Sequence, residues 1–126
     1  MFRLLPLALL LPLPVLADPA LECSDASSQV EIADCLIDTE ARVETALEIA
    51  VDVARSAAAE LDDVTGRVVA VPALEQAQAA WEAYRQAQCD YVGATFGGGS
   101  GTGIGIRSCR IDLTRARIRA LFAHAQ

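Results

Sequence analysis

The chain has 126 residues, a hydrophobic content of 53% and a formal net charge of −7. This length and composition predict one globular domain of modest size. All ten basic residues are arginine, and the net negative charge argues against nucleic acid as a partner, because a phosphate backbone attracts cationic surfaces.

The charge is unevenly distributed along the chain. Residues 18–64 contain 13 acidic side chains and 2 arginines, whereas residues 65–126 contain 4 acidic side chains and 7 arginines. The simpler interpretation is that an acidic first helix packs beside an arginine-bearing last helix. The alternative is that an acidic face attracts a basic protein.

Residues 1–17 have the features of a signal peptide. Arg3 is their only charge, a leucine-rich stretch follows, and the segment ends at Ala17 with small residues where signal peptidase cuts. The apolar run is too short to span about 30 Å of hydrocarbon. We therefore expect cleavage near Ala17, a single exported domain of residues 18–126 in the periplasm or outside the cell, and no membrane span after cleavage.

The four cysteines are expected to form two disulfides, because an exported protein folds in an oxidising compartment. Four cysteines permit three connectivities. Cys23–Cys35 and Cys89–Cys109 are favoured because each closes a short loop, which stabilises by about 3 kcal/mol in the chain-entropy model. The alternative links the N-terminal cysteines to the C-terminal ones. No Cys-x-x-Cys motif occurs and the only histidine is His124, so we expect no metal and no cofactor.

A long first helix is predicted between Ser28 and Gly66. Ser28 and Glu31 have the spacing of a capping box, and Gly66 suits a helix end. Glu40 is the single break in an apolar stripe whose members recur at spacings of three and four residues or their sum. The stripe consists of Leu36, Val43, Leu47, Ala50, Ala54, Ala57 and Leu61. At about 1.5 Å per residue, such a helix is a rod of roughly 45 to 50 Å.

Two further helices are predicted in the second half. After a buried connector at residues 68–71, Pro72 starts the second helix at its first position, and the third starts near Ser108. The second helix has an apolar face with polar borders: Leu74, Ala77, Trp81, Tyr84 and Tyr91, bordered by Gln78, Arg85 and Gln88. The third has the face Ile111, Thr114, Ile118, Leu121 and Phe122. The pattern predicts an all-α fold, a small three-helix bundle with a long first helix.

Residues 97–105 form an unusual stretch, with six glycines among nine residues. No lysine follows them as in a phosphate-binding loop, and Thr102 stands where a nucleophile elbow needs glycine. We therefore expect an exposed loop between the second and third helices, pinned at its base by Cys89 and Cys109. It is either a plain connector or a contact loop.

The cysteines and the glycine stretch belong to a longer motif. Its members are Gln78, Trp81, Tyr84, Arg85, Cys89, Gly98-Gly99-Ser100, Cys109, Thr114, Arg117 and Leu121. This motif resembles that of the lysozyme inhibitor LprI-like domain, a family of exported bacterial proteins, and the similarity covers about residues 23–122. The chain departs from the family pattern on the first helix, where Glu44, Glu48 and Val51 stand in place of the usual Asp, Asn and Tyr.

The motif residues favour a structural role over chemistry. Three of them are expected in the core between the second and third helices: Trp81, Tyr84 and Leu121. Arg85 and Arg117 are expected to cap helix ends or to pair with first-helix carboxylates such as Glu44 or Glu48. No base or nucleophile accompanies them, so we assign no catalytic residue and expect a protein that is not an enzyme.

The resemblance implies that the domain inhibits lysozyme. Residues 18–126 carry a net charge of −8 and are expected to be attracted to a basic lysozyme or another cell-wall hydrolase. The cleft of such an enzyme contains two carboxylates. The contact loop expected to occlude it comprises Gly98, Gly99, Ser100, Thr102 and Arg107. The alternative is a periplasmic interaction or stress module with another partner and no lysozyme inhibition.

Overall fold

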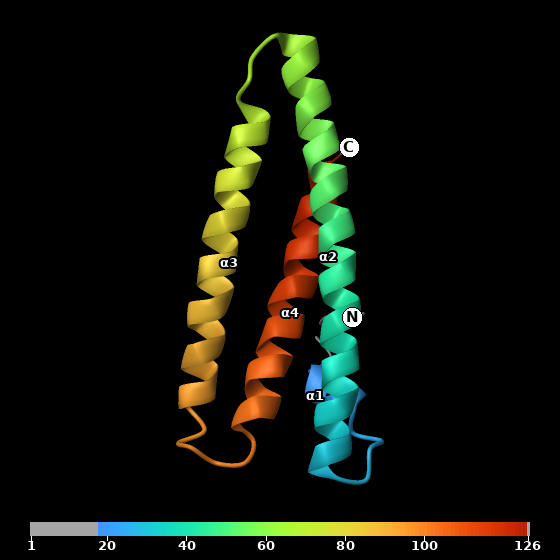
Figure 1. Ribbon diagram of the computed structural model, residues 1–126, viewed down its shortest axis with the longest axis vertical. Helices are drawn as coiled ribbons and strands as arrows, with labels where there is room; N and C mark the ends of the chain where they lie inside the picture. Colours follow the sequence, from blue (N-terminus) through green and yellow to red (C-terminus); the bar gives the residue numbers. More distant parts are fainter. Residues whose placement is uncertain (1–17, 126) are drawn as a thin grey trace, which may run out of the picture.

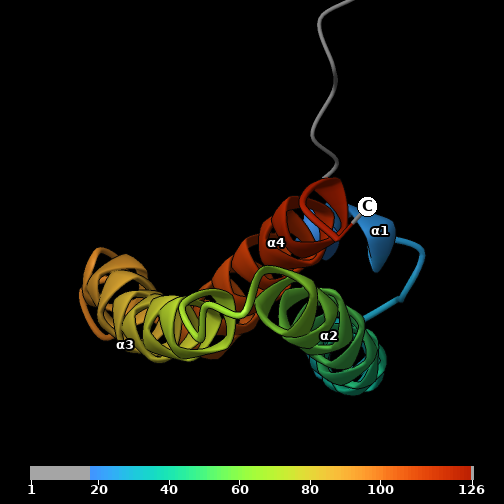
Figure 2. The ribbon, with the colours of Figure 1, turned by 90° about the horizontal axis from the view of Figure 1, so that it is seen from above.

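The protein is a bundle of helices. The computed structural model describes residues 18–125, which form four helices and no strand. They are α1 (Pro19–Glu22), α2 (Gln29–Thr65), α3 (Ala70–Ala94) and α4 (Thr102–Ala123). Successive long helices run in opposite directions (Figure 1), and α4 lies on one side of the α2–α3 pair, with α1 beside it (Figure 2). The predicted all-α bundle is confirmed, with the single-turn helix α1 added to it.

Both predicted ends of α2 are confirmed. The hydroxyl of Ser28 accepts a hydrogen bond from the N–H of Glu31 at 3.2 Å, and the Glu31 carboxylate accepts from the N–H of Ser27 at 2.7 Å. The capping box is therefore closed one residue earlier than its usual form. At the other end, Gly66 has φ 66°, the left-handed conformation that favours glycine and ends a helix.

The core consists of two small clusters along α2. The first contains Cys23, Leu36, Val43 and Ile111, and the second contains Leu47, Ala50, Ala54 and Leu121. The predicted stripe of α2 is thus buried as far as Ala54. Leu61, however, is 55% exposed, because α4 ends at Ala123 and does not reach the α2–α3 turn (Figure 1).

The start of α3 differs from the prediction. The Asp62 carboxylate of α2 accepts hydrogen bonds from three successive backbone N–H groups, those of Val69, Ala70 and Val71, at 3.1, 2.8 and 3.0 Å. Because this cap satisfies the first N–H groups, α3 begins at Ala70 and Pro72 occupies its third position. The connector is not buried, since Val68 is 79% exposed.

The start of α4 also differs from the prediction. The helix begins at Thr102, six residues before Ser108, so the loop contains only residues 95–101. Gly97 and Gly98 have φ 61° and 81° and make the turn. Gly105 is helical and lies directly under the ring of Phe96, where a Cβ would overlap the aromatic carbons. Phe96 of the loop therefore packs against the first turn of α4, a contact that the sequence pattern does not reveal.

The two favoured disulfides are confirmed. Cys23–Cys35 links the end of α1 to α2, with 5.9 Å between the Cα atoms. Cys89–Cys109 links α3 to α4, with 5.6 Å between the Cα atoms. The second bridge fixes the two helices next to the loop that joins them.

Replacing Asp62 with alanine is expected to lower the melting temperature at pH 7, because the first turn of α3 loses its acceptor. The same backbone N–H groups hold the pKa of Asp62 below its ordinary value of 3.8. This stabilisation is therefore fully present above pH 3.8 and disappears as the pH falls through the lower pKa of the folded state. Thermal melts followed by circular dichroism should show the difference between wild type and variant shrinking at acidic pH.

Asp63→Ala is the matched control for this experiment. Asp63 is the exposed neighbour of Asp62, and it contributes a backbone carbonyl, not a side chain, to the end of α2. Its replacement should leave the melting temperature nearly unchanged. Equal losses in D62A and D63A at pH 7 would contradict the capping role of Asp62.

Candidate functional site

Arg85 joins the three long helices. It lies on α3, forms an ion pair with Glu44 of α2, and donates a hydrogen bond through Nη1 to the hydroxyl of Thr114 on α4 at 2.8 Å. Thr114 is fully buried, and only 19% of the Arg85 side chain is exposed. The expected pairing of Arg85 with a first-helix carboxylate is therefore present, and it continues into α4.

Two arginines contact the ring of Trp81. The guanidinium carbon of Arg85 lies 4.7 Å from the ring centroid and that of Arg117 lies 6.0 Å from it, both within the range of cation–π attraction. Arg117 also donates from Nε to the side-chain oxygen of Gln78 at 3.0 Å. Arg117 thus binds another motif residue of α3, where the sequence suggested a helix cap or a first-helix carboxylate.

These contacts place most of the motif in one unit, which we call the motif network. Its members are Gln78, Trp81, Arg85, Thr114 and Arg117, and the buried side chain of Leu121 lies in the core cluster against which Trp81 packs. Their side-chain hydrogen bonds and ion pairs link them to one another, to Glu44 of α2 and, from Gln78, to Glu82 of α3. The network therefore stabilises the packing of α3 on α4 and contains no pair arranged as nucleophile and base.

Tyr84 was wrongly expected in the core. Its side chain is 54% exposed, whereas its neighbour Arg85 occupies the inward position. Here the partners Glu44 and Thr114 compensate the charge of Arg85, so the charged residue faces inward and Tyr84 faces outward.

The departures from the family pattern meet at one place. A polar groove of about 460 Å³ between α2 and α3 is lined by Glu44, Leu47, Glu48, Val51, Asp52, Arg55, Gln78, Glu82 and Arg85. All three departing positions, 44, 48 and 51, line this groove together with the motif residues Gln78 and Arg85. The spacing of positions 44, 48 and 51 places them on one face of α2, and the structure adds that Gln78 and Arg85 of α3 lie beside that face.

Glutamates and arginines also hold α4 against its other neighbours. Glu40, the break in the apolar stripe of α2, pairs with Arg107 and with Arg110 at 3.6 Å. Glu22 of α1 pairs with Arg115, and this ion pair lowers the pKa of Glu22. The acidic first helix therefore packs beside the arginine-bearing last helix, as the charge distribution predicted.

The contact loop is smaller than predicted. Thr102 and Arg107 are helical, the hydroxyl of Thr102 donates to the carbonyl of Gly99 at 2.7 Å, and Arg107 is engaged by Glu40. Gly98, Gly99 and Ser100 remain exposed in the turn at the end of the α3–α4 hairpin (Figure 1). The free part of the loop is thus a narrow tip with almost no side chains.

Residues 18–125 contain neither a cluster of metal-binding side chains nor a membrane-spanning helix. No group of three or more His, Cys, Asp or Glu side chains is arranged to hold a metal ion. None of the helices in this range is long and apolar enough to cross a membrane.

The fold and the motif network define a disulfide-linked helical domain whose distinctive residues hold the helices together. Residues 22–121 match the family model described as Lysozyme inhibitor LprI. An uncharacterised protein of Rhizobium meliloti (strain 1021) is 30% identical over 108 residues, which cover 82% of this chain and 78% of that relative. No solved structure matches the chain significantly. The chain belongs to the lysozyme inhibitor LprI family.

Arg85→Ala is expected to lower the free energy of unfolding by about 2 kcal/mol, because Glu44 and Thr114 lose their partner and Trp81 loses a stacked cation. Arg85→Lys should restore only part of this loss, since an ammonium group cannot stack on the ring and bridge two acceptors as a planar guanidinium does. Urea unfolding followed by the fluorescence of Trp81, the single tryptophan, measures both variants.

Arg67→Ala is the control, because Arg67 is exposed in the α2–α3 turn. It removes the same charge from the protein outside the motif network. If R67A and R85A unfold at the same urea concentration, the network does not stabilise the bundle.

Proposed function

We propose that this protein is an exported envelope protein that binds a basic lysozyme and occludes its substrate cleft. The observation that carries the proposal is the match to the lysozyme inhibitor family over residues 22–121, nearly all of the described chain. The proposed signal peptide, residues 1–17, lies outside the described residues. Its cleavage would deliver the domain to the periplasm or the cell exterior, where lysozymes act.

The charge of the domain supports a basic partner. Residues 18–126 carry a net charge of −8, and α2 has several exposed carboxylates: Asp34, Asp38, Glu48, Asp52 and Asp63. Such a surface accelerates the encounter with a cationic protein and makes the association rate sensitive to salt. The charge thus accounts for attraction, and the fit to the cleft requires a separate feature.

The tip of the α3–α4 hairpin provides that feature. Gly98, Gly99 and Ser100 are exposed on a narrow turn fixed at its base by Cys89–Cys109. Within the described residues, no hydrogen bond uses the N–H groups of Gly98 and Ser100. Backbone N–H groups without side chains can approach the two cleft carboxylates of a lysozyme closely, and the covalent bridge lowers the ordering cost of binding.

The mature protein is expected to slow the lysis of a bacterial cell-wall suspension by a basic c-type lysozyme at micromolar concentration, as measured by turbidity. Raising the ionic strength should weaken the inhibition, since screening reduces the attraction between opposite net charges. Undiminished lysis at micromolar inhibitor would refute lysozyme inhibition for this enzyme class. Inhibition that is unchanged by salt would refute the electrostatic contribution and leave the inhibition itself in place.

Ser100→Trp tests the role of the tip. A large ring on the exposed turn should block entry into the cleft and abolish inhibition, while the melting temperature stays close to that of the wild type. Ser56→Trp is the matched control, because Ser56 is an exposed serine in the half of α2 that approaches the α2–α3 turn, away from the loop. If S100W inhibits as well as S56W, the tip does not enter the cleft.

A further inference from the structure

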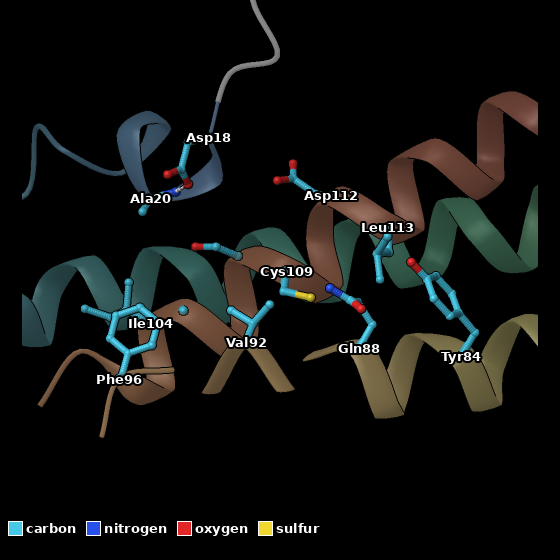
Figure 3. A pocket seen from close by; sticks show the side chains of 12 residues that line it. Asp18, Ala20, Tyr84, Gln88, Val92, Phe96, Ile104, Cys109, Asp112 and Leu113 are labelled. Atoms are coloured by element: carbon cyan, nitrogen blue, oxygen red, sulfur yellow. Dashed lines mark hydrogen bonds between the residues drawn. The ribbon is translucent and has the colours of Figure 1, made fainter. Parts of the chain in front are cut away.

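A second recess adjoins the tip. It is a groove of about 590 Å³ between α3 and α4, closed at one side by α1, and we call it the α3–α4 groove (Figure 3). Phe96 of the loop and Ile104 in the first turn of α4 line the end of the groove near the tip. A partner that receives the tip in its cleft would therefore also face this groove.

The wall of the groove is apolar and aromatic. Val92 and Leu113 line it with two aromatic side chains, Tyr84 and Phe96, which are 54% and 44% exposed. Tyr84 is a motif residue that the motif network does not use. Aromatic side chains at the surface are favoured anchors in protein–protein contacts, because they bury a large area at low cost in side-chain entropy.

The opposite rim of the groove is acidic. Asp112 of α4 and Asp18 at the start of α1 both line it, and their side chains lie across the groove from the wall of α3 (Figure 3). Partial burial raises the pKa of Asp112, and the nearby carboxylates of Asp18 and Glu22 raise it further. Arg115 and Arg119 offset part of this effect, but Arg115 is already bound to Glu22. A cation bound at the rim would therefore reduce the repulsion between these carboxylates.

One polar atom in the groove is unsatisfied. The hydroxyl oxygen of Ser108, a residue that lines the groove between Ile104 and Asp112 on α4, is buried without a hydrogen-bond partner among the described residues. A buried hydroxyl without a partner costs free energy, so the packing of α4 at the base of the groove carries a local cost. The amide of Gln88 lines the groove as well.

We propose that the α3–α4 groove binds an arginine or lysine side chain from the surface of the lysozyme whose cleft receives the tip. The aliphatic stem of that side chain lies against Tyr84 and Leu113, which lie side by side at the same end of the groove (Figure 3), and its cation pairs with Asp112. Long basic side chains combine an apolar stem with a charged end, which matches an apolar wall opposite an acidic rim. The inference rests on the proposed function, and it assigns to Tyr84 the role of an anchor for the partner.

The test measures the dissociation constant of the mature protein with a basic c-type lysozyme by calorimetry. Asp112→Asn and Tyr84→Ala should each weaken binding about tenfold, and the two effects together should be less than additive, because both residues contact one side chain. Asp63→Asn is the matched control for charge. It removes the same charge at the far end of α2 and should change the dissociation constant less than twofold. Circular dichroism and melting temperature check that each variant is folded.

A second measurement keeps the groove testable if lysozyme does not bind. An acetylated tri-arginine peptide is titrated into isotope-labelled wild type and D112N, and amide chemical shifts are recorded. Shifts concentrated around the α3–α4 groove in the wild type and reduced in D112N support the site, even when the failure of lysozyme binding has refuted the proposed function. Two results would overturn the binding role of the groove while leaving inhibition through the tip intact. One is wild-type affinity of D112N and Y84A for lysozyme, and the other is peptide-induced shifts that are equal in wild type and D112N.

Discussion

The guanidinium group of Arg85 lies where α2, α3 and α4 meet, and the arrangement of the bundle depends on it. A charge in that place destabilises a protein unless partners surround it. Glu44 supplies the opposite charge from α2, Thr114 supplies an acceptor from α4, and Trp81 supplies an aromatic face. Because the three partners come from three helices, the position of Arg85 fixes the helices relative to one another. The apolar clusters on either side are small and consist largely of alanine, leucine and cysteine.

Because the motif is used in packing, we place the proposed recognition elsewhere on the surface. Gln78, Trp81 and Arg85 are engaged with one another or with neighbouring helices, and we assign partner binding to the glycine tip and to the α3–α4 groove beside it. Cys89–Cys109 couples these two, because it joins the helices that form the groove close to the loop that forms the tip. A rigid frame with a short exposed turn is a common arrangement in binding proteins, where a preformed loop loses little conformational entropy on contact.

Several features of the fold followed from local chemistry in the sequence. The ends of α2 at Ser28 and Gly66 were predicted because a capping box and a left-handed glycine act within a few residues. The starts of α3 and α4 were not predicted. Asp62 of α2 caps the first turn of α3, and Phe96 of the loop packs against the first turn of α4. The predicted burial of Tyr84 was wrong because its neighbour Arg85, which has partners on α2 and α4, takes the inward position. Periodicity indicates which residues share a helix face but not whether a charged neighbour has partners on other helices.

The sequence by itself determined the helical class, the long acidic first helix, a glycine-rich loop and the motif that marks the family, and it favoured the two disulfides that the structure contains. Each of these rests on composition, short-range spacing or covalent chemistry, which act along the chain. Only the tertiary structure decided that the motif arginines face inward, that Tyr84 faces a groove and that the free tip is shorter than the glycine stretch. These features depend on which helices pack together and on how they are aligned along their axes. Contacts between helices, such as those of Arg85 with Glu44 and of Asp62 with the start of α3, establish that alignment.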